Sequence, residues 1–228
     1  MILDRKADTP AAARNLLRMI RLLMRFAVER GWRKDDPTAS VRQRRTTTEG
    51  FHTWSDDEIA RFEAFWPLGT RARLAMALLL YTGQRRSDVV RMGRQHVSPA
   101  GIAVCQQKTG VRLTIPVHSE LQAALDAAPS DNLTFLTTPQ GSPLAVASFG
   151  NWFRQVAAEA GLPAGRTAHG LRKAAARQLA EAGCTIHQIA AVTGHKSLAM
   201  VGHYTRAADQ AALATQATAM RGRAKTNG

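Results

Sequence analysis

The chain has 228 residues, 45% of them hydrophobic, which allows the packed core of a sizeable domain and argues against wholesale disorder. Lys and Arg number 31 against 17 Asp and Glu, and the formal net charge of +14 predicts a polyanionic partner. Nucleic acid is the first choice and an anionic membrane surface is the competing one, although no apolar run approaches the ~20 residues of a membrane-spanning helix.

The two cysteines, Cys105 and Cys184, lie far apart in the sequence and form no Cys-x-x-Cys pair. This spacing argues against a disulfide framework and against a zinc ribbon. The first ten residues carry no apolar signal core. We therefore expect a reduced, cytoplasmic protein.

The first segment is predicted to be a helix over Pro10 to Arg30, with Gly31 as its stop signal. Its apolar face is formed by Leu16, Leu17, Ile20, Leu23, Met24, Ala27 and Val28. Four arginines are expected in one stripe opposite that face, namely Arg14, Arg18, Arg21 and Arg25. The stripe contains no acidic residue, which favours contact with DNA phosphates over a merely solvated face or a membrane-bound helix.

The segment from Asp35 to Glu49 is polar, contains Pro37 and is predicted to be a linker. Its basic residues are further candidates for DNA contact: Arg42, Arg44 and Arg45.

A second domain is predicted to open with a capping box, in which Ser55 is the N-cap and Glu58 the third helical residue. A further helix is expected over Arg71 to Tyr81, ending at Gly83, and another from Ser87.

The hydrophobic period changes between Gly101 and Val117. The stretches 102–104 and 113–115 flank Lys108-Thr109-Gly110, which predicts a β-hairpin. Later helices are expected over about 145–160, 169–182 and 185–192, near Tyr204, and in the Ala-rich tail 207–220. The predicted fold class is therefore mostly α with one small antiparallel β-sheet (α+β).

Four motifs carry residues suited to chemistry, and they occur in a fixed order. They are Thr82-Gly83-Gln84-Arg85-Arg86-Ser87-Asp88, Gln107-Lys108-Thr109-Gly110, His169-Gly170-Leu171-Arg172, and Gly194-His195 followed by Tyr204. Each motif alone is weak evidence for catalysis, because a turn lysine, a capping histidine or a packed tyrosine is common. The ordered set is specific.

From about His52 to Ala214 these motifs resemble the tyrosine recombinase (phage integrase) family, in which a Gly-x-Arg box, a hairpin lysine, His-x-x-Arg, Gly-His and a tyrosine follow one another. The resemblance implies three segments. Residues 1–49 would be the end of a DNA-clamping (core-binding) domain with its linker, residues 50–220 the catalytic domain, and residues 221–228 a frayed tail. It also implies a bacterial or phage-encoded protein associated with the nucleoid.

The resemblance implies that DNA is cut by transesterification, with Tyr204 as the nucleophile and a 3′-phosphotyrosyl intermediate. Arg85 and Arg172 would clamp the phosphate, since a guanidinium donates paired hydrogen bonds and keeps its charge. His169 would be the general base or would hold the tyrosine, and His195 would donate a hydrogen bond to the phosphate. Lys108 would protonate the 5′-oxygen leaving group. No cofactor, metal or ATP is implied.

Two departures from the family pattern concern the first motif. Asp88 stands where the family more often has glutamate, and we expect its carboxylate to orient the arginine cluster. Arg86 beside Arg85 makes the register ambiguous, and the Gly-x-Arg spacing favours Arg85.

Two other functions compete with a recombinase. The segment from Ala180 to Arg206 resembles a helix-turn-helix, so the chain could be a plain DNA-binding regulator, but the other motifs would then be unexplained. A defective integrase remnant would keep the fold and bind DNA without recombining it. A two-metal nuclease is disfavoured because acids are scarce. Double-stranded DNA is the expected partner, and the family implies a monomer when free that assembles as a homo-tetramer on DNA.

Overall fold

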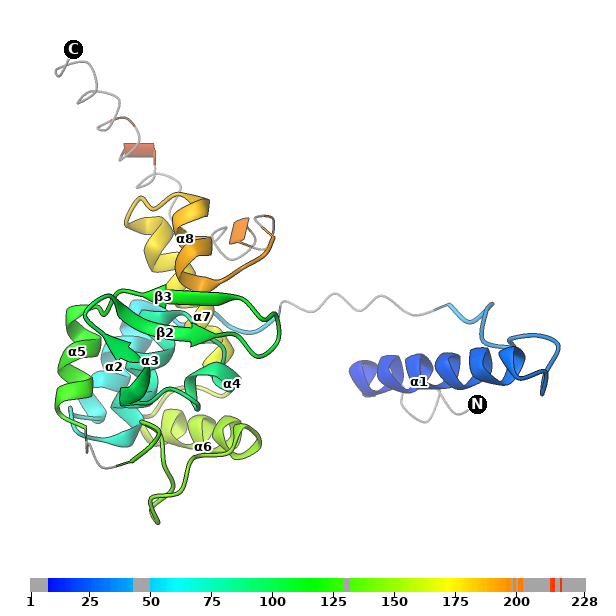
Figure 1. Cartoon of the computed structure of the whole chain (residues 1–228), viewed down its shortest axis with the longest axis horizontal. Coiled ribbons are helices and arrows are strands. Elements are labelled where there is room, and N and C mark those ends of the chain that lie inside the picture. Colours follow the sequence, from blue (N-terminus) through cyan, green and yellow to red (C-terminus); the bar gives the residue numbers. More distant parts are fainter. Residues whose placement is uncertain are drawn as a thin grey trace. The chain divides into compact units, whose positions relative to one another are not determined.

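The computed structural model describes residues 8–42, 50–128, 132–197, 199, 201–202, 214–215 and 218. The chain divides into two compact units, Met1–Gly50 and Phe51–Gly228 (Figure 1). Tyr204, Arg44, Arg45 and most of the expected tail helix lie outside the described residues.

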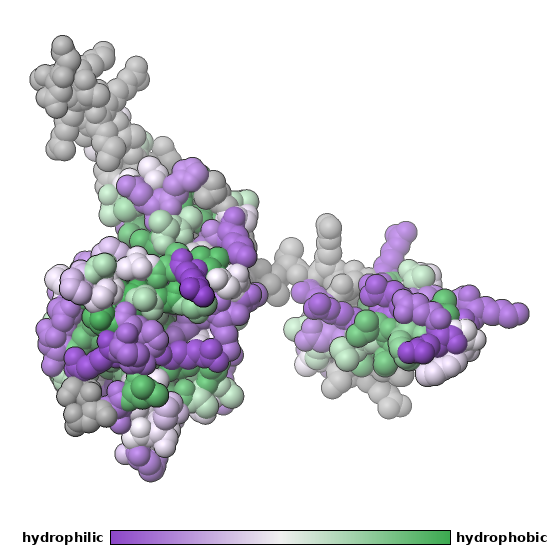
Figure 2. Space-filling view, in the orientation of Figure 1, coloured by the Kyte–Doolittle hydropathy of each residue, from purple (hydrophilic) through white to green (hydrophobic). Residues whose placement is uncertain are grey.

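The smaller unit is built on α1 (Pro10–Glu29), which ends as expected before Gly31, a residue with a φ of 70°. Its apolar face is only partly as predicted. Leu17 is the buried residue of the helix, whereas Leu23 is 58% exposed. Figure 2 shows apolar surface on this unit, and the exposed large apolar side chains of α1 are Met19, Leu22, Leu23 and Phe26.

The predicted arginine stripe borders the covered side of α1 and does not lie opposite it. Arg21 is half-buried, and its Nη2 donates to the carbonyl oxygen of Val41 at 2.6 Å. The other described arginines of the candidate DNA-contacting set are exposed: Arg14, Arg18, Arg25 and Arg42. Arg21 therefore ties the helix to the segment that follows it.

The larger unit opens with α2 (Asp56–Phe65), and the predicted capping box is confirmed. The Glu58 amide donates to Ser55 Oγ at 3.2 Å, and the Ser55 amide donates to Glu58 Oε2 at 3.0 Å. The next helix, α3 (Arg71–Thr82), is buried along most of its length and packs against α5 and α7. It is thus the central helix of the unit.

The predicted hairpin is confirmed as β2 (Gly101–Cys105) and β3 (Arg112–Ile115), paired antiparallel with Ile102 opposite Ile115. Both isoleucines are buried, so this face of the hairpin covers the core. A short strand that was not predicted, β1 (Val97–Ser98), pairs with β2 and completes a sheet of order β1-β2-β3.

The remaining elements are helical, and most begin and end within one or two residues of the predicted positions. They are α4 (Arg86–Val89), the 3-10 helix η2 (Arg94–His96), α5 (Ser119–Asp126), α6 (Val146–Glu159), α7 (Ala168–Glu181) and α8 (Ile186–Thr193). Only α5 and η2 were not expected. The fold class, mostly α with one small antiparallel sheet, is confirmed. None of the described helices has both the length and the apolar character needed to cross a membrane.

An aromatic cluster fixes the position of α7. Trp54, Phe62, Phe149 and Phe153 are fully buried, with ring centroids 5.6–6.0 Å apart in the contacting pairs. Trp54 Nε1 donates at 3.1 Å to the carbonyl oxygen of Thr167, the N-cap residue of α7. In Figure 1, α6 lies below the sheet and α8 above it. The packing therefore holds the start of α7, where His169 and Arg172 lie.

Candidate active site

Residues from the first and third motifs meet in one open cleft of about 440 Å³. The cleft is lined by side chains from the start of α4, from α6 and from the first turn of α7, together with Phe51. Arg85, Arg86, His169 and Arg172 are among its lining residues. Segments that are more than 80 residues apart in the sequence thus form one surface rich in cations.

Of the two adjacent arginines, Arg85 is the one that joins the cluster. It is the N-cap residue of α4, and its Nη1 donates to Gln106 Oε1 at 3.1 Å. Its positive charge is one of the causes that lower the pKa of His169 and of His195. Arg86 is exposed and its guanidinium lies against Gly150 of α6. The geometry therefore favours Arg85 over Arg86 as the motif arginine.

Arg172 is a cation held almost entirely inside the protein, with 1% of its surface exposed. Its Nη1 donates to the carbonyl oxygen of Gly83 at 2.5 Å, and its Nη2 lies 2.9 Å from His195 Nε2. Gly83 is the C-cap residue of α3 and has a φ of 60°, a conformation that glycine adopts without strain. The helix therefore ends at the residue whose carbonyl oxygen accepts from Arg172. The glycine of the first motif therefore helps to place the arginine of the third.

The hydrogen bonds around His195 define its tautomer. A guanidinium only donates, so His195 Nε2 accepts from Arg172 and the neutral ring carries its proton on Nδ1. Nδ1 then donates to Thr193 Oγ1 at 2.6 Å, and that hydroxyl donates to the carbonyl oxygen of Ile189 at 2.7 Å. Burial, followed by the charges of Arg172, Arg85 and His169, lowers the pKa of His195 to about 3. In this arrangement His195 supports Arg172, and its expected hydrogen bond to phosphate stays a prediction.

His169 lines the cleft from the first turn of α7 and contacts Phe51 edge to face, with ring centroids 4.8 Å apart. Lys173 Nζ donates at 2.7 Å to the carbonyl oxygen of Phe51, which fixes that residue beside the histidine. Burial first, and then the charges of Arg172, Lys173, Arg85 and Lys108, lower the pKa of His169 to about 4. The ring is therefore neutral at physiological pH and can accept a proton.

Replacing Phe51 by alanine is expected to raise the pKa of His169 from about 4 towards its ordinary value of 6.5, because the ring contributes to the burial that disfavours the charged form. An NMR titration of the histidine ring signals, assigned with a His169→Gln variant, measures this change. Phe51→Leu keeps an apolar side chain there and should leave the pKa low. Phe65→Ala, at an exposed phenylalanine of α2, is the matched control. An unchanged pKa in Phe51→Ala would contradict the role given to this contact.

The contacts of Asp88 are with the hairpin and with its neighbour Ser87. Its Oδ1 accepts from the backbone amide of Gln107 at 2.9 Å and lies 3.5 Å from Ser87 Oγ, and no ion pair with an arginine is found among the described residues. Asp88 is 3% exposed and projects from the single turn of α4 towards the hairpin. It therefore anchors the base of the hairpin, one residue before Lys108.

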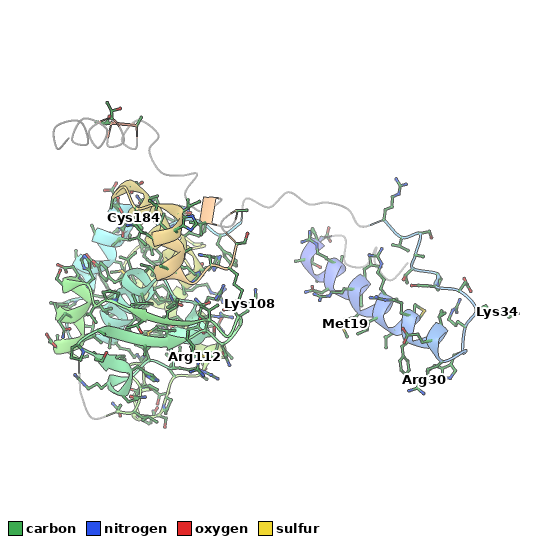
Figure 3. All side chains as sticks on the ribbon, turned by 45° about the horizontal axis from the view of Figure 1, so that its top comes forward. Met19, Arg30, Lys34, Lys108, Arg112 and Cys184 are labelled. Atoms are coloured by element: carbon green, nitrogen blue, oxygen red, sulfur yellow. The ribbon has the colours of Figure 1, made fainter. Side chains whose placement is uncertain are left out.

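Lys108 lies in the turn between β2 and β3, where Figure 3 shows it at the end of the hairpin and Arg112 at the start of β3. Its side chain is exposed, yet its charge is one of the causes that lower the pKa of His169. The hairpin thus brings the lysine towards the same cluster. Tyr204 lies outside the described residues, so its distance from the cleft is not defined.

Three residues of the site were not singled out from the sequence. Gln84 and Gln106 are buried polar residues within or beside the motifs, and Phe51, which lines the cleft, lies two residues after the predicted linker. A glutamine in a stretch that is otherwise core-forming was the available signal for the first two. Nothing in the sequence marked Phe51. Among the described residues, no three His, Cys, Asp or Glu side chains gather in a way that could hold a metal ion.

Comparisons with known proteins agree with this geometry. The model of the phage integrase family matches residues 56–211. The integrase of Escherichia phage HK022 is 26% identical over 213 residues, which cover 87% of this chain and 59% of that protein. This chain thus spans about three fifths of the length of that relative.

Solved structures show the same fold. A lambda integrase dimer bound to a COC′ core site matches with a TM-score of 0.78 and 24% identity, over 91% of this chain and 64% of that one. The Tn1549 transposon integrase in complex with a circular intermediate DNA matches with a TM-score of 0.73 and 15% identity, over 96% and 82%. Since the family model covers well over half of the sequence, the chain belongs to the phage integrase family of tyrosine recombinases.

Proposed function

We propose that this chain carries the catalytic domain of a site-specific DNA recombinase, which cuts and rejoins DNA by transesterification through a 3′-phosphotyrosine at Tyr204. The observation that carries the proposal is the cluster of Arg85, Arg172 and neutral His169 in one cleft of a phage integrase family member. Preorganised cations of this kind stabilise the charge that develops on a phosphoryl group in the transition state.

The two arginines would bind the non-bridging oxygens of the scissile phosphate. Arg172 is fixed by Gly83 and His195, and Arg85 by Gln106, so neither guanidinium has to be ordered when DNA arrives. Such preorganisation lowers the barrier because the reorganisation is already complete before the reaction begins.

Proton transfers would be divided between His169 and Lys108. The pKa of His169 near 4 leaves its ring neutral, so it can accept the proton of the Tyr204 hydroxyl or hold that hydroxyl in place for attack. Lys108, exposed at the hairpin turn, would donate a proton to the 5′-oxygen that leaves. The backbone hydrogen bonds that Gln106 makes within the turn, and the bond from the Gln107 amide to Asp88, limit where this lysine can move. No metal ion or ATP enters any of these steps.

Double-stranded DNA is the proposed substrate and partner. A lambda integrase tetramer bound to a Holliday junction matches this chain with a TM-score of 0.74 and 24% identity, over 86% of this chain and 62% of that one. By analogy, this chain would assemble as a homo-tetramer on DNA. The unit Met1–Gly50 would be part of the DNA-clamping domain, with Arg14, Arg18, Arg25 and Arg42 on its exposed surface.

The test is capture of the covalent intermediate. The protein is incubated in EDTA with a pool of nicked duplexes whose core sequence is randomised, so that cleavage releases a short fragment and traps the adduct. A covalent protein–DNA band on a denaturing gel, enriched for particular sequences, is expected. If the protein binds DNA but gives no adduct at any sequence, the chain is instead a non-catalytic DNA-binding member of the family.

A further inference from the structure

Gln106 is a buried glutamine at the end of β2, 1% exposed, that uses all of its hydrogen-bonding capacity. Its Oε1 accepts from Arg85 Nη1 at 3.1 Å and from Thr109 Oγ1 at 2.6 Å. Its Nε2 donates to Gln84 Oε1 at 2.7 Å and to the carbonyl oxygen of Thr193 at 2.9 Å. The amide orientation is defined because Arg85 can only donate and a carbonyl can only accept.

These bonds join three segments that carry the candidate catalytic residues. Arg85 itself lies on the first, Thr109 is the neighbour of Lys108 in the hairpin turn, and Thr193 ends α8 two residues before His195. The backbone of Gln106 also closes that turn, because its amide donates to Val111 and its carbonyl oxygen accepts from Gly110, both at 2.8 Å.

The side chain of Gln106 also explains why the Gly-His motif has a glycine at position 194. Gly194 has a φ of 69°, and a Cβ there would lie 2.2 Å from Gln106 Nε2. A larger residue would displace the amide as well as strain the backbone. The end of α8 can therefore approach the hairpin closely because Gly194 leaves room for the Gln106 amide.

We propose that Gln106 is a positioning residue that aligns Arg85, the Lys108 turn and the His195 segment for reaction. The inference rests on the proposed recombinase function. Gln106 would act through these groups and would not touch DNA. Its loss would free one edge of the Arg85 guanidinium and leave the Thr193 carbonyl oxygen and Gln84 Oε1 without this donor.

Gln106→Met keeps the length of the side chain and removes all four bonds. We expect the single-turnover rate of adduct formation at saturating DNA to fall by ~100-fold, the loss typical of a misplacement of about 1 Å in an active site. DNA affinity should stay close to that of the wild type, because most phosphate contacts position the protein from elsewhere. Gln106→Asn, shorter by one methylene and still an amide, should show a similar loss, and it provides the test if the methionine variant does not fold.

Gln84→Met separates positioning from stability. Gln84 is equally buried, its Nε2 donates to the carbonyl oxygens of Thr82 and Val192, and its Oε1 accepts from Gln106. It makes no bond to Arg85, so its replacement removes one of the four bonds of Gln106 and leaves the bond to Arg85 in place. We expect a comparable loss of thermal stability and a much smaller loss of rate. Gln122→Met, at an exposed position on α5, is the control for the substitution itself and should change neither quantity.

An NMR spectrum of the Arg85 guanidinium, labelled with ¹⁵N, gives a readout that does not depend on cleavage. The bonded Nη1 protons should be protected from exchange in the wild type and in Gln84→Met, and should lose protection in Gln106→Met. Equal rates for the two methionine variants, or unchanged Arg85 protection, would overturn the positioning role. Absence of an adduct with the wild-type protein would instead overturn the proposed function and leave the NMR comparison to decide on Gln106.

Discussion

Arg172→Lys is expected to slow covalent adduct formation by about 100- to 1000-fold, the loss that follows removal of one preorganised transition-state contact. Lysine carries the same charge but presents a single ammonium group. It cannot replace the planar fork of Arg172, which donates to the Gly83 carbonyl oxygen and to His195 Nε2 and, under the proposed function, would also bind a phosphate oxygen. The rate at saturating DNA in a single turnover measures the effect.

Arg73→Lys provides the matched control for this substitution. Arg73 is a half-buried arginine of α3 that pairs with Glu63 and does not line the cleft. Its replacement should leave the rate of adduct formation unchanged. If Arg172→Lys cleaved at the rate of the control, the guanidinium of Arg172 would have no part in the chemistry.

Trp54→Ala is expected to destabilise the larger unit by about 3–5 kcal/mol, the cost of removing a large aromatic side chain from a packed core. Trp54 is fully buried, contacts the rings of Phe62 and Phe153, and donates to the carbonyl oxygen of Thr167. Chemical denaturation monitored by circular dichroism measures the change in the free energy of unfolding.

Two other variants show which part of that loss comes from packing. Trp54→Phe keeps a ring but removes the hydrogen bond to Thr167, and should cost about 1 kcal/mol. Phe65→Ala, at a side chain that is 51% exposed, should cost less than Trp54→Ala by a wide margin. A small loss in Trp54→Ala, equal to that of Phe65→Ala, would contradict the view that this cluster holds α7.

Local signals in the sequence were sufficient for most of the fold. The Ser55 capping box and the turn at Lys108-Thr109-Gly110 depend on neighbours only a few residues away, and both are confirmed. By contrast, α5 was missed because it is only eight residues long and its N-cap is His118, which is not one of the usual capping residues. The strand β1 has two exposed residues and exists only by pairing with β2, so it carries no period to detect.

The candidate site could be predicted in composition but not in its internal contacts. Of the residues that the motifs named, Arg85, His169 and Arg172 line one cleft. His195 lies against Arg172, and the charge of Lys108 acts on His169. Which atom of His195 accepts a hydrogen bond, and where the carboxylate of Asp88 points, depend on packing between distant segments. The contacts of Asp88 and of Gln106 could therefore be found only in the folded chain.

The most direct test of the central claim is the comparison of wild-type protein with Tyr204→Phe on a nicked duplex recovered from the capture experiment, in EDTA. Phenylalanine keeps the ring and removes the attacking hydroxyl. The claim predicts a covalent adduct with the wild type, mapped by mass spectrometry of the digested complex to the peptide containing Tyr204, and no adduct with the variant while DNA binding is retained. An adduct that persists in Tyr204→Phe, or that maps to another residue, would contradict it.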